Sequence, residues 1–142
     1  MIMIKKLIPD KYYKTINDIP YTELYEKGFR LILTDLDNTL ISYKETDPTK
    51  ELYDWLKMVT EIGFEVIIVS NSKKYRVEYF ADQLGVKYVK YAQKPLKKGL
   101  KRALKIASRK YDRSEVLEIG DQIMTDVFGS KADLSNLTSS KA

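Results

Sequence analysis

FRLILTDLDNTL, residues 29–40, decides the fold class of this chain. Residues 29–34 form a short apolar run rich in strand-forming residues and bounded by Gly28, which is typical of a buried strand. Acidic and amide side chains follow this run at once, in the sequence DLDN. A buried strand that ends in a polar cluster is typical of a parallel α/β sheet, in which ligands bind at the carboxyl ends of the strands.

The rest of the chain alternates helix and strand patterns. Further strands are predicted at residues 64–69, 86–89 and 116–119, and helices from Thr46 to Gly63, from Ser72 to Gly85 and from Pro95 to Ala107. Apolar strands separated by helices of this length predict βαβ units. We therefore expect an α/β fold with three layers, in which helices cover both faces of a parallel sheet.

The two ends of the chain carry weaker patterns. Residues 1–28 contain tyrosines, two prolines and no clear strand, which predicts one or two short helices that wrap the edge of the sheet. Residues 129–142 are small and polar, which predicts a disordered tail. A chain of 142 residues is long enough for one buried core, so we expect a single domain over residues 1–128.

The composition excludes several kinds of chemistry. The sequence contains no cysteine and no histidine, which rules out thiol or histidine nucleophiles, disulfides and thiol- or imidazole-bound zinc. Catalysis must therefore use carboxylates, hydroxyls, amides, lysines and arginines. No secretory signal and no run of about 18 apolar residues is visible. We expect a cytoplasmic protein, with peripheral membrane contact left open.

Positive charge is concentrated in one stretch. Residues 87–113 hold eleven basic residues and one acidic residue, Asp112, for a net charge of +10, whereas the remainder of the chain carries −5. Two interpretations stay open. The stretch is either a solvated helix face beside an acidic site or a surface that attracts an anionic substrate or membrane.

Polar side chains follow all four predicted strands. They are Asp35, Asp37 and Asn38 after the first strand, Ser70 and Asn71 after the second, Lys94 after the third, and Asp121 and Asp126 after the fourth. Because the carboxyl ends of parallel strands meet at one edge of a sheet, we expect these side chains to converge.

These residue types suit phosphoryl transfer to a carboxylate. Asp35 and Asp37 are two close negative charges that favour a divalent cation, and Asp121 would complete a magnesium site. The cation and Lys94 would remove the repulsion between an attacking carboxylate and a phosphate. Asp37 would protonate the leaving oxygen and then activate water.

Each signal also has a plainer interpretation. A DxD sequence is often a turn, Ser70 and Asn71 could cap a helix, and the Gly120-Asp121 pair could be a turn. The order of the signals favours the catalytic interpretation, because each one follows a predicted strand.

Four ordered motifs resemble those of the haloacid dehalogenase (HAD) superfamily. They are DLDNTL at residues 35–40, similar to DxDxT, VSNS at 69–72, Lys94, and GDQIMTD at 120–126, similar to GDxxxxD. The details, including Lys94-Pro95, resemble subclass IIIA and its YqeG-type phosphatases, which are related to the mitochondrial phosphatidylglycerophosphate phosphatases. The likeness runs from about Ile8 to Gly129.

The resemblance implies a magnesium-dependent phosphatase with a Rossmann-like core. It implies that Asp35 is the nucleophile and a metal ligand, that Asp37 is the acid/base and binds the metal through its carbonyl, and that Asp121 is the third ligand. It also implies phosphate binding by Asn38, Ser70, Asn71 and Lys94, loop geometry fixed by Thr39, and Lys94 or a metal-bound water oriented by Asp126.

Two features bear on the substrate and the fold. The segments between the motifs leave no room for a large cap, so the site should be open and suit a bulky substrate such as a lipid head group. Family members continue past the fourth motif with a helix and a strand, so we expect the last strand or strands to be missing.

Phosphatidylglycerophosphate is the expected substrate. The alternatives are a soluble sugar phosphate, nucleotide or phosphoprotein, or a non-catalytic module that binds nucleic acid through the basic stretch.

Overall fold

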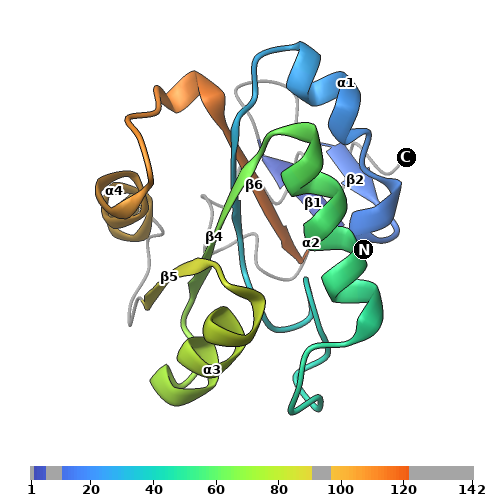
Figure 1. Cartoon of the computed structure of the whole chain (residues 1–142), viewed down its shortest axis with the longest axis vertical. Helices are drawn as coiled ribbons and strands as arrows, with labels where there is room; N and C mark the ends of the chain where they lie inside the picture. The colour runs from blue at the N-terminus through green and yellow to red at the C-terminus, as the bar shows by residue number, and fades with distance from the viewer. Residues whose placement is uncertain (1, 6–10, 91–96, 122–142) are drawn as a thin grey trace.

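The computed structural model describes residues 2–5, 11–90 and 97–121. A six-stranded sheet in the order β2-β1-β6-β3-β4-β5 forms its centre (Figure 1). The strands are β1 (Ile2–Lys5), β2 (Lys11–Tyr13), β3 (Leu31–Thr34), β4 (Glu65–Ser70), β5 (Lys87–Lys90) and β6 (Val116–Asp121). The helices are α1 (Tyr21–Glu26), α2 (Lys50–Ile62), α3 (Lys74–Leu84), α4 (Lys97–Ile106) and the one-turn 3-10 helices η1 (Ile16–Asp18) and η2 (Arg113–Glu115).

The four strands β6, β3, β4 and β5 are parallel, which confirms the predicted parallel α/β sheet. Thr34 on β3 lies beside Ile68 on β4 and Ile119 on β6. The carboxyl ends of these three strands therefore meet at one edge of the sheet. This edge is called the rim below.

Helices cover both faces of the sheet, as Figure 1 shows. Successive side chains of a strand point to opposite faces. Ile32 accordingly packs in a core with residues of α1, α2 and α3, whereas Leu31 and Leu33 pack in a second core with Ala103 of α4. All four side chains of β3 are buried. This arrangement confirms the three-layer fold.

The helix starts differ slightly from the predicted ones. The side chain of Thr49 caps α2 by accepting a hydrogen bond from the Leu52 N–H at 3.2 Å, so the helix begins one turn after Thr46. Helix α3 begins at Lys74, two residues after Ser72, whose hydroxyl donates a hydrogen bond to Asp37. The predicted helix start at Pro95 lies outside the described residues.

The N-terminal segment differs from its prediction. The sequence predicts no strand in residues 1–28, but β1 pairs antiparallel with β6 and β2 pairs antiparallel with β1. The predicted short helices are present as η1 and α1. The short strand β1 is stabilised by pairing with β2 on one side and β6 on the other. A local sequence pattern does not encode such pairing. The predicted tail at residues 129–142 lies outside the described residues.

None of the helices in the described part of the chain is long and apolar enough to span a membrane.

Candidate active site

A tight loop leaves β3 at the rim and carries the first motif. The Leu36 carbonyl accepts a hydrogen bond from the Ile41 N–H at 3.2 Å, and the Asn38 N–H donates to the Ile41 carbonyl at 2.6 Å. Asn38 has a φ of 63°, a left-handed conformation that asparagine tolerates better than most residues. The loop thus turns sharply between Asp35 and Ile41.

Asp35 lies at the base of this loop and is only 4% exposed. Its carboxylate accepts a hydrogen bond from the Leu36 N–H at 2.8 Å. Its own N–H lies 3.4 Å from the Ile119 carbonyl on β6. Because β6 ends at Asp121, the main chains of Asp35 and Asp121 lie at the same part of the rim.

Asp37 is held by two side chains that the sequence analysis did not identify. Its Oδ1 accepts a hydrogen bond from Arg76 Nε at 2.9 Å and lies 2.7 Å from Arg76 Nη2. Its Oδ2 accepts a hydrogen bond from the Ser72 hydroxyl. Ser72 belongs to the VSNS motif, but its sequence position predicts only a helix start. A single arginine in a helix carries no motif signal at all.

Helix α3 also restrains the loop at residues 42–47. Arg76 Nη1 donates to the Glu45 carbonyl at 2.6 Å, and Nη2 donates to the Ser42 carbonyl at 3.2 Å. The Tyr79 hydroxyl donates a hydrogen bond to the Asp47 carboxylate, and this bond raises the pKa of Tyr79. The segment between the first motif and α2 is therefore attached to α3 at several points.

The second motif contributes Ser70 and Asn71 to the rim. Ser70 is fully buried, and its Oγ accepts a hydrogen bond from the Ser72 N–H at 3.1 Å. The Asn71 carbonyl accepts a hydrogen bond from Lys90 Nζ at 3.1 Å. Lys90 ends β5, so it brings a positive charge to the rim that the sequence analysis did not identify.

Two predicted site residues, Lys94 and Asp126, lie outside the described residues. Of Asp121, only the place of its main chain at the end of β6 is described. Within residues 2–5, 11–90 and 97–121, no group of three acidic, cysteine or histidine side chains could hold a metal ion.

The predicted magnesium site does not require such a group. The sequence-based prediction assigns to it two carboxylates, Asp35 and Asp121, together with the backbone carbonyl of Asp37. These are the hard oxygen donors that magnesium prefers, and they come from the neighbouring ends of β3 and β6. The donor chemistry therefore fits magnesium.

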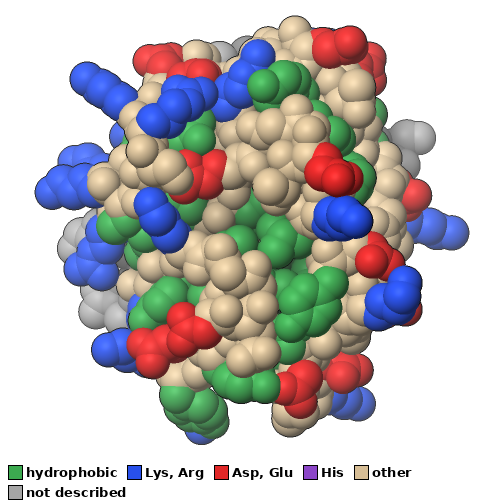
Figure 2. Space-filling model, in the orientation of Figure 1, with side chains coloured by type: hydrophobic (Ala, Val, Ile, Leu, Met, Phe, Trp, Pro, Cys, Tyr) green, Lys and Arg blue, Asp and Glu red, His purple; other side chains and the backbone are tan. Residues whose placement is uncertain are grey.

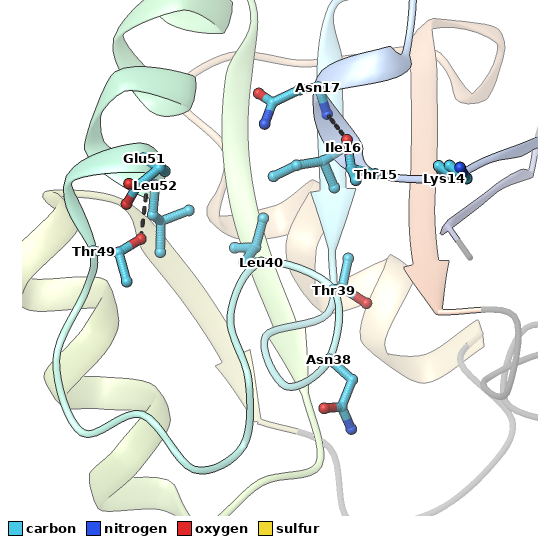
Figure 3. A pocket seen from close by; sticks show the side chains of 10 residues that line it. All are labelled: Lys14, Thr15, Ile16, Asn17, Asn38, Thr39, Leu40, Thr49, Glu51 and Leu52. Carbon is cyan, nitrogen blue, oxygen red and sulfur yellow. Dashed lines mark hydrogen bonds between the residues drawn. The ribbon is translucent and has the colours of Figure 1, made fainter.

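A pocket of about 300 Å³ lies beside the loop of the first motif (Figure 3). It is lined by Lys14, Thr15, Ile16, Asn17, Asn38, Thr39, Leu40, Thr49, Glu51 and Leu52. Thr39 is 8% exposed, and among the described residues its hydroxyl has no hydrogen-bond partner.

The basic stretch forms an exposed face of α4. Lys101, Arg102 and Lys105 are exposed, whereas Ala103 is buried against the sheet. Figure 2 shows basic side chains gathered on the side of the molecule where Figure 1 places α4. A second pocket of about 330 Å³ lies between β5 and α4 and is lined by Tyr88, Val89, Lys90, Arg102, Lys105 and Ile106.

Comparison with known proteins shows two relatives and one family. The family model described as mitochondrial PGP phosphatase matches residues 1–136. The probable phosphatase YqeG of Bacillus subtilis is 38% identical over 128 residues, which cover 89% of this chain and 73% of the relative. The mannosyl-3-phosphoglycerate phosphatase of Pyrococcus horikoshii is 40% identical over 57 residues, which cover 40% of this chain and 22% of the relative. No solved structure matches the chain.

Proposed function

Because the chain belongs to the mitochondrial PGP phosphatase family, and is thus a phosphatase of the HAD type, we propose that it hydrolyses phosphate monoesters through an aspartyl phosphate on Asp35. One observation carries this proposal. The buried Asp35 carboxylate lies at the end of β3, beside the end of β6, and a second carboxylate, Asp37, is held in place two residues later.

In the first step, an Asp35 carboxylate oxygen attacks the phosphorus atom. The bond between phosphorus and the leaving oxygen breaks, and that oxygen takes a proton from Asp37. The products of this step are the alcohol, the aspartyl phosphate and an ionised Asp37.

In the second step, Asp37 acts as the base. It accepts a proton from a water molecule as the water oxygen attacks the phosphorus atom. The bond between phosphorus and Asp35 breaks, which releases inorganic phosphate and regenerates the Asp35 carboxylate. Asp37 is then protonated and ready for another substrate.

This chemistry also requires that the negative charges of the Asp35 carboxylate and the phosphate be neutralised. Asp35, Asp121 and the Asp37 carbonyl would hold a magnesium ion, which when bound supplies positive charge beside the phosphoryl oxygens. Lys94 would add a further positive charge, and Asp126 would orient it. The other phosphate-binding residues are Asn38, Ser70 and Asn71.

We further propose phosphatidylglycerophosphate as the substrate, which the enzyme would reach from the cytoplasm by peripheral contact with the membrane. The family name supports this choice. The basic face of α4 also supports it, because anionic bilayers attract basic side chains. The pocket between β5 and α4 combines apolar residues such as Val89 and Ile106 with cations such as Arg102, a combination that suits an anionic amphiphile.

The test is a phosphate-release assay on a panel of substrates, with magnesium or with a chelator. The panel includes phosphatidylglycerophosphate in detergent, sugar phosphates, nucleotides and phosphopeptides. Asp35→Asn should lower kcat by orders of magnitude, because a neutral amide is a far weaker nucleophile than a carboxylate. Asp82→Asn, an exposed aspartate of α3, is the matched control and should retain activity. Asp35→Asn activity above about a tenth of the wild-type value would contradict the mechanism.

A further inference from the structure

Arg76 directs all of its side-chain nitrogens toward the loop that follows Asp35. Nε and Nη2 contact Oδ1 of Asp37, at 2.9 and 2.7 Å. The two terminal nitrogens also donate to the carbonyls of Glu45 and Ser42. The guanidinium lies 4.7 Å from the centre of the Phe80 ring, and the Arg76 side chain is only 18% exposed. These contacts hold the guanidinium in one orientation.

Among the described residues, the contacts of Asp37 leave one acceptor position of its Oδ2 atom without a partner. An ionised carboxylate has about four positions that can accept hydrogen bonds. Arg76 occupies both positions of Oδ1, whereas Ser72 occupies one position of Oδ2. The remaining position of Oδ2 can carry the transferred proton. The Asp37 side chain is 23% exposed, so it is not closed off from solvent.

We propose that Arg76 is the positioning residue of the acid/base Asp37, with Ser72 as its second support. This inference rests on the proposed function, since it assumes that Asp37 donates a proton to the leaving oxygen. Arg76 itself stays protonated and transfers no proton. Its role is to fix the Asp37 carboxylate so that Oδ2 faces the substrate. It also ties the loop at residues 42–45 to α3 through the Ser42 and Glu45 carbonyls.

Lysine cannot replace Arg76 in this role. The planar guanidinium carries five donors and reaches three groups on the loop at once, whereas an ammonium group has its three donors on one atom. Arg76→Lys should therefore behave like Arg76→Ala, although it preserves the charge. A residue that served only as a positive charge would be replaced successfully by lysine.

The test compares two esters of similar shape, phenyl phosphate and dinitrophenyl phosphate. Phenoxide is a poor leaving group that needs a proton, whereas dinitrophenoxide leaves readily without one. The value of kcat/KM reports the steps up to phosphoryl transfer. Arg76→Ala should lower kcat/KM for phenyl phosphate at least about tenfold more than for dinitrophenyl phosphate, within the range of general acid catalysis. Asp37→Asn should show the same selective loss.

Arg109 offers a matched control for the loss of an arginine. It also pairs with a carboxylate, that of Glu115 at 3.2 Å, and its guanidinium also lies over an aromatic ring, that of Tyr111 at 3.9 Å. It precedes β6 and therefore lies at the opposite end of the sheet from the rim. Arg109→Ala should change kcat/KM for the two esters by the same factor. The melting temperature of this variant shows how much stability is lost with such an ion pair.

A double-mutant cycle separates positioning from substrate binding. In the Asp37→Asn background, Arg76→Ala should change kcat/KM for phenyl phosphate less than about threefold, because the two side chains act as a unit. Equal losses on both esters, or additive losses in the cycle, would overturn the role of Arg76 while leaving the proposed function intact. Failure of the wild-type enzyme to release phosphate from either ester, or full activity of Asp37→Asn, would count against the proposed function itself.

Discussion

At the scale of single residues, the site depends on how a buried negative charge is compensated. Asp35 is 4% exposed, and burial of a carboxylate is costly unless hydrogen bonds or cations offset it. The Leu36 N–H contributes one hydrogen bond. A second carboxylate at the end of β6, that of Asp121, would add to the negative charge, so a cation between them should stabilise the folded protein.

The residue-scale prediction therefore concerns magnesium and Asp121. Magnesium at saturating concentration should raise the melting temperature of the wild-type protein by several degrees, since a ligand at 100 times its Kd adds about 2.7 kcal/mol. Asp121→Ala should abolish both this shift and the activity. Asp126→Ala should have a milder effect, because its predicted role is to orient other groups. Scanning calorimetry with and without magnesium checks the prediction.

Asp82→Ala is the control for the loss of a surface carboxylate. It should leave the magnesium-induced shift unchanged. Hydrolysis that proceeds equally well in the presence of a chelator, or a full magnesium shift in Asp121→Ala, would argue against the metal site.

The sequence predicts some residues of the site but not others. Asp35 and Asp37 belong to a compact motif, so short-range spacing indicates them. Arg76 lies 39 positions after Asp37 and Ser72 lies 35 positions after it. The packing of α3 against the loop brings these residues together, and no local pattern encodes that packing. The contact of Lys90, at the end of β5, with the Asn71 carbonyl was not predicted either, because it also joins residues that are far apart in the sequence.

At the scale of secondary-structure elements, Glu65 links the start of β4 to the segment that follows α4. Its carboxylate accepts hydrogen bonds from the Ser108 N–H and hydroxyl and from the Tyr111 hydroxyl at 2.8 Å. Lys87 Nζ lies 4.0 Å away. Burial alone would raise the pKa of Glu65, but these hydrogen bonds and the positive charge together hold the pKa below its usual value.

This lowered pKa leads to a stability prediction with a definite sign. The ionised Glu65 stabilises the fold above the pKa of an unfolded glutamate, about 4.3, and this contribution is lost as the pH falls through the lower folded pKa. Glu65→Gln should reduce the free energy of unfolding by about 1–2 kcal/mol at pH 7 and by less at about pH 3.5. Urea denaturation at both pH values measures the difference.

Glu61→Gln, at an exposed position of α2, is the control and should change stability little at either pH. If Glu65→Gln cost the same free energy at both pH values, the hydrogen bonds to the ionised carboxylate would not be the source of its effect.

Prediction of the elements succeeded where the apolar pattern was long. The predicted strand at residues 64–69 became β4 (Glu65–Ser70), a shift of one residue. The start of α2 was placed one turn early, because Thr46 and Thr49 are both capping residue types and only the structure shows which hydroxyl is used. The hairpin of β1 and β2 was missed, since pairing with β6 stabilises these short strands.

At the scale of the whole molecule, the basic surface and the larger apolar core lie on opposite faces of the sheet. The exposed cations of α4 lie on one face of the sheet, and the larger apolar core lies on the other face. Lys90 connects this basic face to the rim through its hydrogen bond with the Asn71 carbonyl. An anionic surface bound to α4 would therefore lie close to the candidate site.

Charge reversal of this face should impair action on a lipid more than on a small ester. Replacement of Lys101, Arg102 and Lys105 by glutamate should abolish co-sedimentation with anionic vesicles at low salt, because each basic residue contributes about 1 kcal/mol near such a surface. Turnover of phosphatidylglycerophosphate in vesicles should fall at least about tenfold. Hydrolysis of dinitrophenyl phosphate should change by less than about twofold.

Replacement of Lys27, Lys50 and Lys57, which are exposed on or beside α1 and α2, by glutamate gives the matched control with the same change in net charge. This control should retain vesicle binding. Equal loss on both substrates in the α4 variant would show that the basic face serves the site or the fold rather than a membrane.

The most direct test of the central claim is to trap the phosphorylated enzyme. The protein is mixed with a rapidly hydrolysed phosphate ester, quenched in acid, reduced with borohydride and digested for mass spectrometry. Borohydride converts an aspartyl phosphate into homoserine. The proposed mechanism predicts homoserine at position 35 in the wild-type protein and none at this position without substrate. Conversion at a different residue, or phosphate release with no conversion at position 35, would contradict the mechanism.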